Sequence, residues 1–136
     1  MKSLKASFFL VGAIAALSAL LVACGGSDKP SATVDADLTE WSVKPSTSEV
    51  NAGTIKFAGH NKGTQVHEIA LITLNADGSR HEIEDHEGLK PGESGDFTVK
   101  NLKAGKYELV CLLAPGQFGS TVDHYQQGMH TEFTVK

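Results

Sequence analysis

The segment HEIALITL, residues 67–74, is apolar at both odd and even positions after its first two residues. Side chains alternate between the two faces of a β-strand, so a run of this kind is typical of a strand that is covered on both faces. The turn sequence NADG, residues 75–78, ends the run. We therefore predict a central strand over residues 67–74.

The sequence around this segment contains further short strands separated by turn signals such as NKG, KPG and KAG. In TVDADLTEWSV, residues 33–43, the apolar alternation changes phase, which indicates a bulge or a bend. A helical period of 3.6 residues does not occur after residue 24. This pattern predicts an all-β fold, an antiparallel sandwich or barrel. The other predicted strands are TIKFAGH (54–60), GDFTV (95–99), KYELVCLL (106–113) and TEFTV (131–135).

Residues 75–94, NADGSRHEIEDHEGLKPGES, form the least regular part of the sequence. We predict a solvated acidic loop here. The alternative is a loose divalent-cation site that uses His81, His86 and the neighbouring acidic side chains.

The N-terminus has the pattern of an export signal. Lys2 and Lys5 precede an apolar stretch that ends at Cys24. The string LVAC resembles the lipobox of bacterial lipoproteins, which implies that residues 1–23 are a signal peptide and that Cys24 carries a lipid. The alternative is an uncleaved transmembrane anchor. In both cases the two lysines keep the N-terminus inside, and the remainder lies outside the cytoplasm.

We expect three parts in the chain: the signal peptide 1–23, a lipidated flexible tether 24–33 and one compact domain 34–136. The localisation that follows is the cell envelope, with the protein held at a membrane by the lipid. After loss of the signal, ten basic side chains face sixteen acidic ones, a formal charge of −6. Because no basic stripe is present, we do not expect a nucleic-acid partner.

Cys111 has no disulfide partner if Cys24 is lipidated. An oxidising compartment attacks free thiols, so this cysteine is either buried and inert or protected by a bound metal. Strand parity favours the second interpretation. His67, Cys111 and Met129 each lie on the face opposite the glutamate of their own strand, which we take to mark the solvent side.

Strand direction brings these residues to one end of the predicted sandwich. His67 begins a strand, Cys111 ends one, and Met129 immediately precedes the last, with His124 in the intervening loop. Two imidazoles and a thiolate in one plane, with a weakly attached axial methionine, suit a blue-copper ion. Zinc accepts cysteine and histidine, but a thioether is a poor fourth ligand for it.

The chain from about residue 33 to 136 resembles the cupredoxins, small blue-copper proteins with an antiparallel Greek-key β-sandwich. The resemblance is carried by AGTIKFAGHNKGTQVHEIAL, GKYELVC and HYQQGMHTEFTV. It implies one mononuclear type 1 copper ion, with His67 and His124 as equatorial histidines, Cys111 as the thiolate and Met129 as the axial ligand. It also implies that an exposed His124, with Tyr125 and its loop, contacts a redox partner protein.

The sequence departs from the family in one place. Cupredoxins usually carry the second histidine a few residues after the cysteine, whereas residues 112–123 separate Cys111 from His124 here. Gln117 stands where the histidine is expected. Either the loop holds an insertion that leaves His124 and Met129 intact, which we favour, or Gln117 marks an altered site.

Three functions are compatible with the sequence. The first is a one-electron carrier, which transforms no substrate and is not an enzyme. The second is copper capture or delivery without redox turnover, and the third is a metal-free β-sandwich used for interaction. His60 and His130 are expected near the same end as rim residues, not as ligands.

Overall fold

The computed structural model describes residues 29–136. The predicted signal peptide and Cys24, the predicted lipidation residue, lie outside this range. No helix in the described part of the chain is long and apolar enough to cross a membrane.

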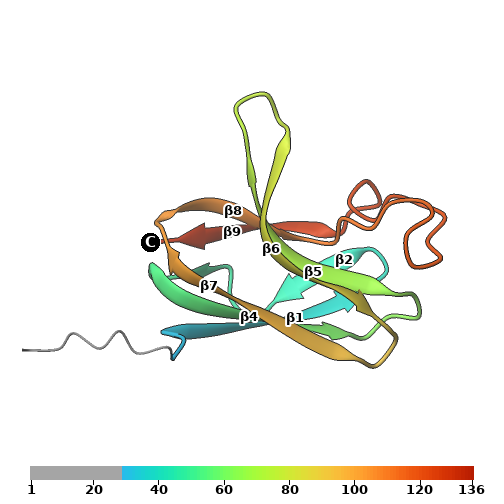
Figure 1. The fold of residues 1–136 in the computed structure, drawn as a ribbon, viewed down its shortest axis with the longest axis horizontal. Coiled ribbons are helices and arrows are strands. Elements are labelled where there is room, and N and C mark those ends of the chain that lie inside the picture. The colour runs from blue at the N-terminus through green and yellow to red at the C-terminus, as the bar shows by residue number, and fades with distance from the viewer. Residues whose placement is uncertain (1–28) are drawn as a thin grey trace, which may run out of the picture.

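Two β-sheets pack face to face (Figure 1). The predicted all-β sandwich is therefore confirmed. Most neighbouring strands are antiparallel, but β1 pairs with β4, and β3 with β9, in parallel. One sheet has the order β2 (Ser42–Pro45), β1 (Ala32–Thr39), β4 (Gly53–Asn61) and β7 (Ser94–Leu102). The other has the order β3 (Glu49–Val50), β9 (His130–Val135), β8 (Gly105–Val110), β5 (His67–Leu74) and β6 (Arg80–Leu89).

The strand predicted from HEIALITL is β5, and it lies between β8 and β6. Its first six residues are all buried. Ile69 and Leu71 face the core between the sheets, whereas Ala70 and Ile72 belong to a smaller cluster on the outer face. The two-sided apolar pattern thus reflects cover on both faces of the sheet.

The phase change in residues 33–43 is a tight hairpin. Thr39 pairs with Ser42, and Glu40 and Trp41 form the turn between β1 and β2. Apolar side chains keep facing the core because the chain reverses direction at this point. This places Glu40 and Trp41 at the end of the sandwich where His67 begins β5.

The acidic loop predicted for residues 75–94 is wrong for the middle half of that segment. Residues 80–89 form β6, which pairs antiparallel with β5 and bulges twice. β6 is an edge strand, and nearly all of its side chains are exposed or half-buried. An edge strand of this kind gains its hydrogen bonds from β5 without burying an apolar stripe, so its sequence lacks a strand pattern.

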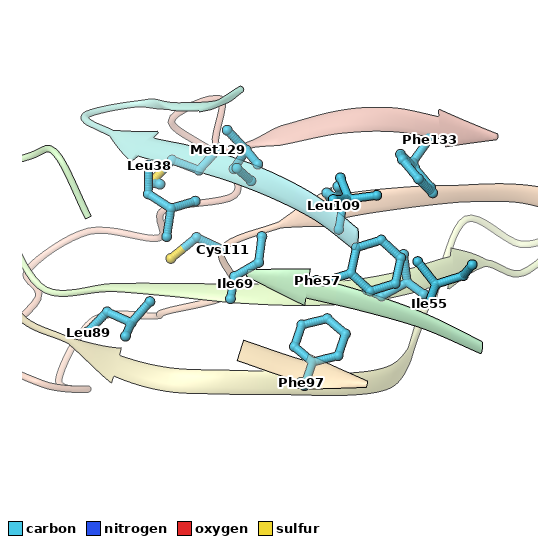
Figure 2. Close-up of a cluster of buried hydrophobic side chains, with 14 of the residues drawn as sticks. Leu38, Ile55, Phe57, Ile69, Leu89, Phe97, Leu109, Cys111, Met129 and Phe133 are labelled. Atoms are coloured by element: carbon cyan, nitrogen blue, oxygen red, sulfur yellow. The ribbon is translucent and has the colours of Figure 1, made fainter. Parts of the chain in front are cut away.

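The main core lies between the sheets and contains three phenylalanine rings, of which Phe57 contacts the other two. Phe57 stacks on Phe97 with centroids 5.3 Å apart and meets the edge of Phe133 at 5.5 Å. Cys111 and Met129 belong to the same cluster, and both lie toward the same end of it (Figure 2). The sandwich therefore places two sulfur-bearing side chains toward one end of its core.

Candidate metal centre

Three of the predicted ligands come from the ends of strands. His67 is the first residue of β5, Cys111 follows β8 directly, and Met129 directly precedes β9. The Cys111 N–H donates to the Met129 carbonyl at 2.9 Å, which extends the pairing of β8 with β9 by one step. The loop that joins these strands lies at one end of the sandwich, in orange and red in Figure 1.

The long loop after Cys111 is closed at its base. The His124 N–H donates to the Leu113 carbonyl at 2.9 Å, so residues 114–123 form a separate excursion. Gln117 is exposed, and its Oε1 accepts a hydrogen bond from the Ala114 N–H at 2.7 Å. His124, rather than Gln117, faces Cys111, as the insertion hypothesis requires.

His67, Cys111 and His124 bring their donor atoms together in the interior. The ligand atoms lie within 4.8 Å of one another. The two Nδ1 atoms are 3.3 Å apart, and Cys111 Sγ is 3.4 Å from His124 Nδ1. All three side chains have 0% exposure. This is a compact set of two nitrogens and one sulfur, shielded from water.

Each imidazole is held through its other nitrogen. His67 Nε2 lies 3.2 Å from Glu40 Oε1, and His124 Nε2 lies 3.0 Å from Ser120 Oγ. Partners of this kind fix the ring orientation and the tautomer of a metal-binding histidine. Both Nδ1 atoms are thereby directed toward the same point beside Cys111 Sγ. The edge of Trp41 also packs against the His124 ring, with centroids 5.1 Å apart.

Sequence reasoning did not find Glu40 or Ser120. Glu40 lies in a hairpin turn, and its Oε1 also accepts from the N–H groups of Thr64 and Gln65 at 2.7 and 2.9 Å. Burial raises the pKa of Glu40, but these two N–H groups and His67 outweigh it and bring the pKa to about 2. A charged carboxylate therefore stands behind His67. The dipeptide Glu40–Trp41, in the turn between β1 and β2, was the only feature of the sequence that could have indicated this contact.

Burial also decides the charge of the donor atoms. It lowers the pKa of His67, against the effect of Glu40, and it lowers the pKa of His124, assisted by the nearby His67. Burial raises the pKa of the Cys111 thiol to about 12. The imidazoles are neutral and ready to bind, whereas the thiol needs a cation beside it to lose its proton.

Met129 is the fourth predicted ligand. Its side chain is fully buried in the core cluster, and its N–H donates to the His124 carbonyl at 3.1 Å. The turn of residues 124–129 therefore ties the second histidine to the methionine. Cys111 Sγ also accepts a hydrogen bond from the Glu68 N–H at 3.3 Å.

This donor set fits a copper ion of the type 1 class. Two imidazole nitrogens and a thiolate would form its equatorial set, and the thioether of Met129, at the same end of the core, would suit its weak axial position. Among the described residues, His67, Cys111 and His124 are the only group of three or more histidine, cysteine or acidic side chains with converging donor atoms. His81 and His86 do not form such a group with the acids of β6.

Two expectations about exposure are wrong. Glu68 does not mark a solvent side, because it is 3% exposed and its Oε2 accepts from the Leu112 N–H at 3.3 Å. His124 is not an exposed port, because Trp41 and the loop with Ser120 cover it. A pocket of about 240 Å³ approaches His124 between the segment 64–66 and residues 118–120.

His60 and His130 are not part of the converging group. His60 lies on the outer face of the four-stranded sheet, between Asp35 and Ser94. His130 stacks on Tyr125, with ring centroids 4.4 Å apart.

Comparisons with known proteins agree with this description. The sequence model of the cupredoxin-like domain family matches residues 10–135. No curated protein matches the sequence significantly.

Several solved structures share the fold. Dithionite-reduced auracyanin from the photosynthetic bacterium Roseiflexus castenholzii superposes with a TM-score of 0.58 at 21% identity, covering 79% of this chain and 99% of that one. Auracyanin A from Chloroflexus aurantiacus, described as a blue copper protein, gives 0.52 at 20% identity, with 76% and 99% covered. Auracyanin B gives 0.60 at 18% identity, with 80% and 91% covered.

Proposed function

The chain belongs to the cupredoxin-like domain family, and we propose that it is an electron carrier with one type 1 copper ion. In this proposal His67 and His124 bind through Nδ1, Cys111 binds as the thiolate, and Met129 is the axial ligand. The convergence of three buried donor atoms within 4.8 Å at one tip of the sandwich carries the proposal.

A bound copper ion would supply the redox chemistry, because it can exist as Cu(I) or Cu(II) and so take up or release one electron. The protein's part is to hold its donors still. Glu40 and Ser120 fix the two imidazoles, and the Glu68 N–H donates to Cys111 Sγ. Donors that do not rearrange between the two oxidation states favour rapid electron transfer.

Complete burial of His67, Cys111 and His124 supports a carrier over a protein that captures and delivers copper. A delivery site has to open for exchange of its metal. Here both histidines are anchored on their far side, and the loop 114–123 is closed at its base. These contacts favour a retained ion.

We further propose that the domain works in the cell envelope, outside the cytoplasm, held to a membrane by a lipid on Cys24. The basic N-terminus, the apolar stretch and the string LVAC support this localisation. Its partner would be another redox protein. Metabolic labelling with a radioactive fatty acid tests the anchor, because label should enter the wild type and be lost in Cys24→Ser.

Copper titration of the full-length protein in detergent tests the site. We expect an intense visible thiolate-to-copper band with one equivalent of Cu(II), and its loss in Cys111→Ala and in His124→Ala. Cys24→Ser is the matched cysteine control and should keep the band. Persistence of the band in His124→Ala would overturn the assignment of the second histidine.

Reversible reduction tests the carrier function itself. Ascorbate should bleach the band and air or ferricyanide should restore it, with the ion still bound. Release of copper to a Cu(I) chelator in each cycle would contradict the carrier and support delivery.

A further inference from the structure

Tyr125 follows the second histidine directly, and its ring lies on the outer face of the five-stranded sheet. There it packs against a buried cluster formed by Ala70 and Ile72 of β5 and Val110 of β8. This face is opposite to the one that carries Cys111. Two consecutive side chains therefore point to opposite faces of the sheet: His124 faces the core and Tyr125 faces outward.

Three polar or aromatic contacts hold the Tyr125 ring. Its hydroxyl donates to Glu108 Oε2 at 2.8 Å. The guanidinium of Arg80, the single arginine of the chain, lies 4.2 Å from the ring centroid, and the His130 ring stacks on it at 4.4 Å and 18°. Arginine over an aromatic face combines charge attraction with planar stacking.

These contacts come from three different strands. Glu108 lies in β8, His130 begins β9, and Arg80 begins β6 beyond the hairpin turn that stands out from the sandwich in Figure 1. The Tyr125 side chain is therefore held by residues of three strands. The protruding hairpin is thereby connected to the loop that carries the metal ligands.

The turn that follows Tyr125 transmits its position to Met129. The Gly128 N–H donates to the Tyr125 carbonyl at 3.0 Å, and the Met129 N–H donates to the His124 carbonyl at 3.1 Å. His124 and Met129 are thus the two ends of one short hydrogen-bonded turn. Fixing Tyr125 fixes the separation of these two side chains.

We propose that Tyr125 is a positioning residue, which holds His124 and Met129 in place relative to Cys111 through its contacts with Arg80, Glu108 and His130. This inference rests on the proposed copper site. It assigns a part in setting the ligand geometry to the β5–β6 hairpin, which lies outside the loop that carries His124 and Met129.

The test compares Tyr125→Leu with Tyr107→Leu in the full-length protein in detergent. Tyr107 is the matched control, because it is also half-buried, and its hydroxyl donates to the Lys103 carbonyl at 2.8 Å at the other end of β8. We expect Tyr125→Leu to shift the Cu(II) visible band and the EPR hyperfine splitting, and to raise the copper dissociation rate about tenfold. Tyr107→Leu should leave all three unchanged.

Two milder variants keep the proposal testable if Tyr125→Leu does not fold. Tyr125→Phe keeps the ring between Arg80 and His130 but loses the bond to Glu108, and Arg80→Gln removes the cation. Both should shift the spectra in the same direction as Tyr125→Leu, by less. Spectra and dissociation rates equal to those of Tyr107→Leu would overturn the positioning role.

Hydrogen exchange of the metal-free protein separates this inference from the proposed function. The N–H groups of Gly128 and Met129 should exchange faster in Tyr125→Leu than in the wild type. In Tyr107→Leu they should exchange at the wild-type rate. If the wild type shows no thiolate-to-copper band, the copper proposal fails, whereas the exchange comparison still decides whether Tyr125 holds the turn. Unchanged exchange in Tyr125→Leu would overturn the inference.

Discussion

Two histidines seven residues apart in the sequence form similar pairs in different surroundings. His67 Nε2 lies 3.2 Å from Glu40, and His60 Nε2 lies 3.0 Å from Asp35. His67 is fully buried at the tip of the sandwich, whereas about a third of the His60 side chain, 32%, is exposed on the outer face of the other sheet.

The second nitrogen separates the two cases. His67 Nδ1 lies 3.3 Å from His124 Nδ1. Both atoms are hydrogen-bond acceptors, so neither supplies a proton to bond the other. His60 Nδ1 meets Ser94 Oγ at 2.8 Å, and its ring is satisfied on both sides. A histidine–carboxylate pair therefore marks a metal ligand only when the remaining nitrogen converges with further donor atoms away from water.

Removing the imidazoles gives the largest expected difference. His67→Ala should lower copper affinity by more than about 100-fold, beyond the effect usual for outer partners, because an equatorial ligand is lost. His60→Ala is the matched control and should leave the affinity unchanged. Competition titration with a Cu(II) chelator measures both. Equal losses in the two variants would contradict the division drawn here between site and surface.

Changing the carboxylates tests the outer contact alone. Glu40→Gln keeps an acceptor oxygen but removes the charge behind His67, and should weaken copper binding roughly 10- to 100-fold. Asp35→Asn makes the same change behind His60 and should have no effect. The same chelator competition gives both values. An effect of Asp35→Asn as large as that of Glu40→Gln would show that general charge, not the contact, is responsible.

Glu68 extends the comparison. It is a buried carboxylate at the same end of the sandwich as the site, but it does not contact a histidine ring. Burial, with Glu82 and Asp85 nearby, raises its pKa from 4.5 to about 8. The folded state thus binds a proton that the unfolded chain releases at lower pH. This effect makes the metal-free protein less stable as the pH rises from about 4.5 to about 8.

Glu68→Gln should remove that loss while keeping an acceptor for the Leu112 N–H. We expect the variant to gain stability over the wild type between pH 5 and pH 8, on the order of 2 kcal/mol. Urea unfolding of the reduced, metal-free proteins at both pH values measures it. A difference that does not change with pH would mean that Glu68 is charged in the folded protein.

Sequence reasoning predicted well the regions in which burial requires a regular pattern of apolar residues. β5 is covered on both faces, and its apolar run has no other simple explanation. β6 carries no such pattern, because its ladder to β5 is built from backbone groups and its side chains meet water. Hydrogen bonds between strand backbones alone do not require a particular pattern of side chains.

The site divides in the same way. The positions of His67 and Cys111 follow from strand order and parity. The rule that a glutamate marks the solvent side failed for Glu68, because Tyr125 and the ligand loop cover the outer face of the sheet. Glu40 and Ser120 could not be predicted. Each reaches its histidine from a turn whose path depends on the folded chain, and a single acid or serine in a turn is usually a solvated residue.

The smallest expected difference concerns the two serines. Ser120 Oγ contacts His124 Nε2 at 3.0 Å and also donates to the Val122 carbonyl at 2.8 Å, so it holds the ring and shapes the loop above it. Ser94 Oγ contacts His60 at 2.8 Å. A neutral hydroxyl contributes less than a carboxylate to the orientation of a ligand, since its hydrogen bond carries no charge.

Ser120→Ala should therefore raise the copper dissociation rate severalfold, less than Glu40→Gln does, whereas Ser94→Ala should leave it unchanged. Stopped-flow transfer to a chelator measures both rates. The alanine also frees Nε2, so the His124 ring gains freedom to rotate and the EPR lines should broaden. If Ser120→Ala matches Ser94→Ala in rate and line width, His124 is held by Trp41 and its own backbone, and the hydroxyl only shapes the loop.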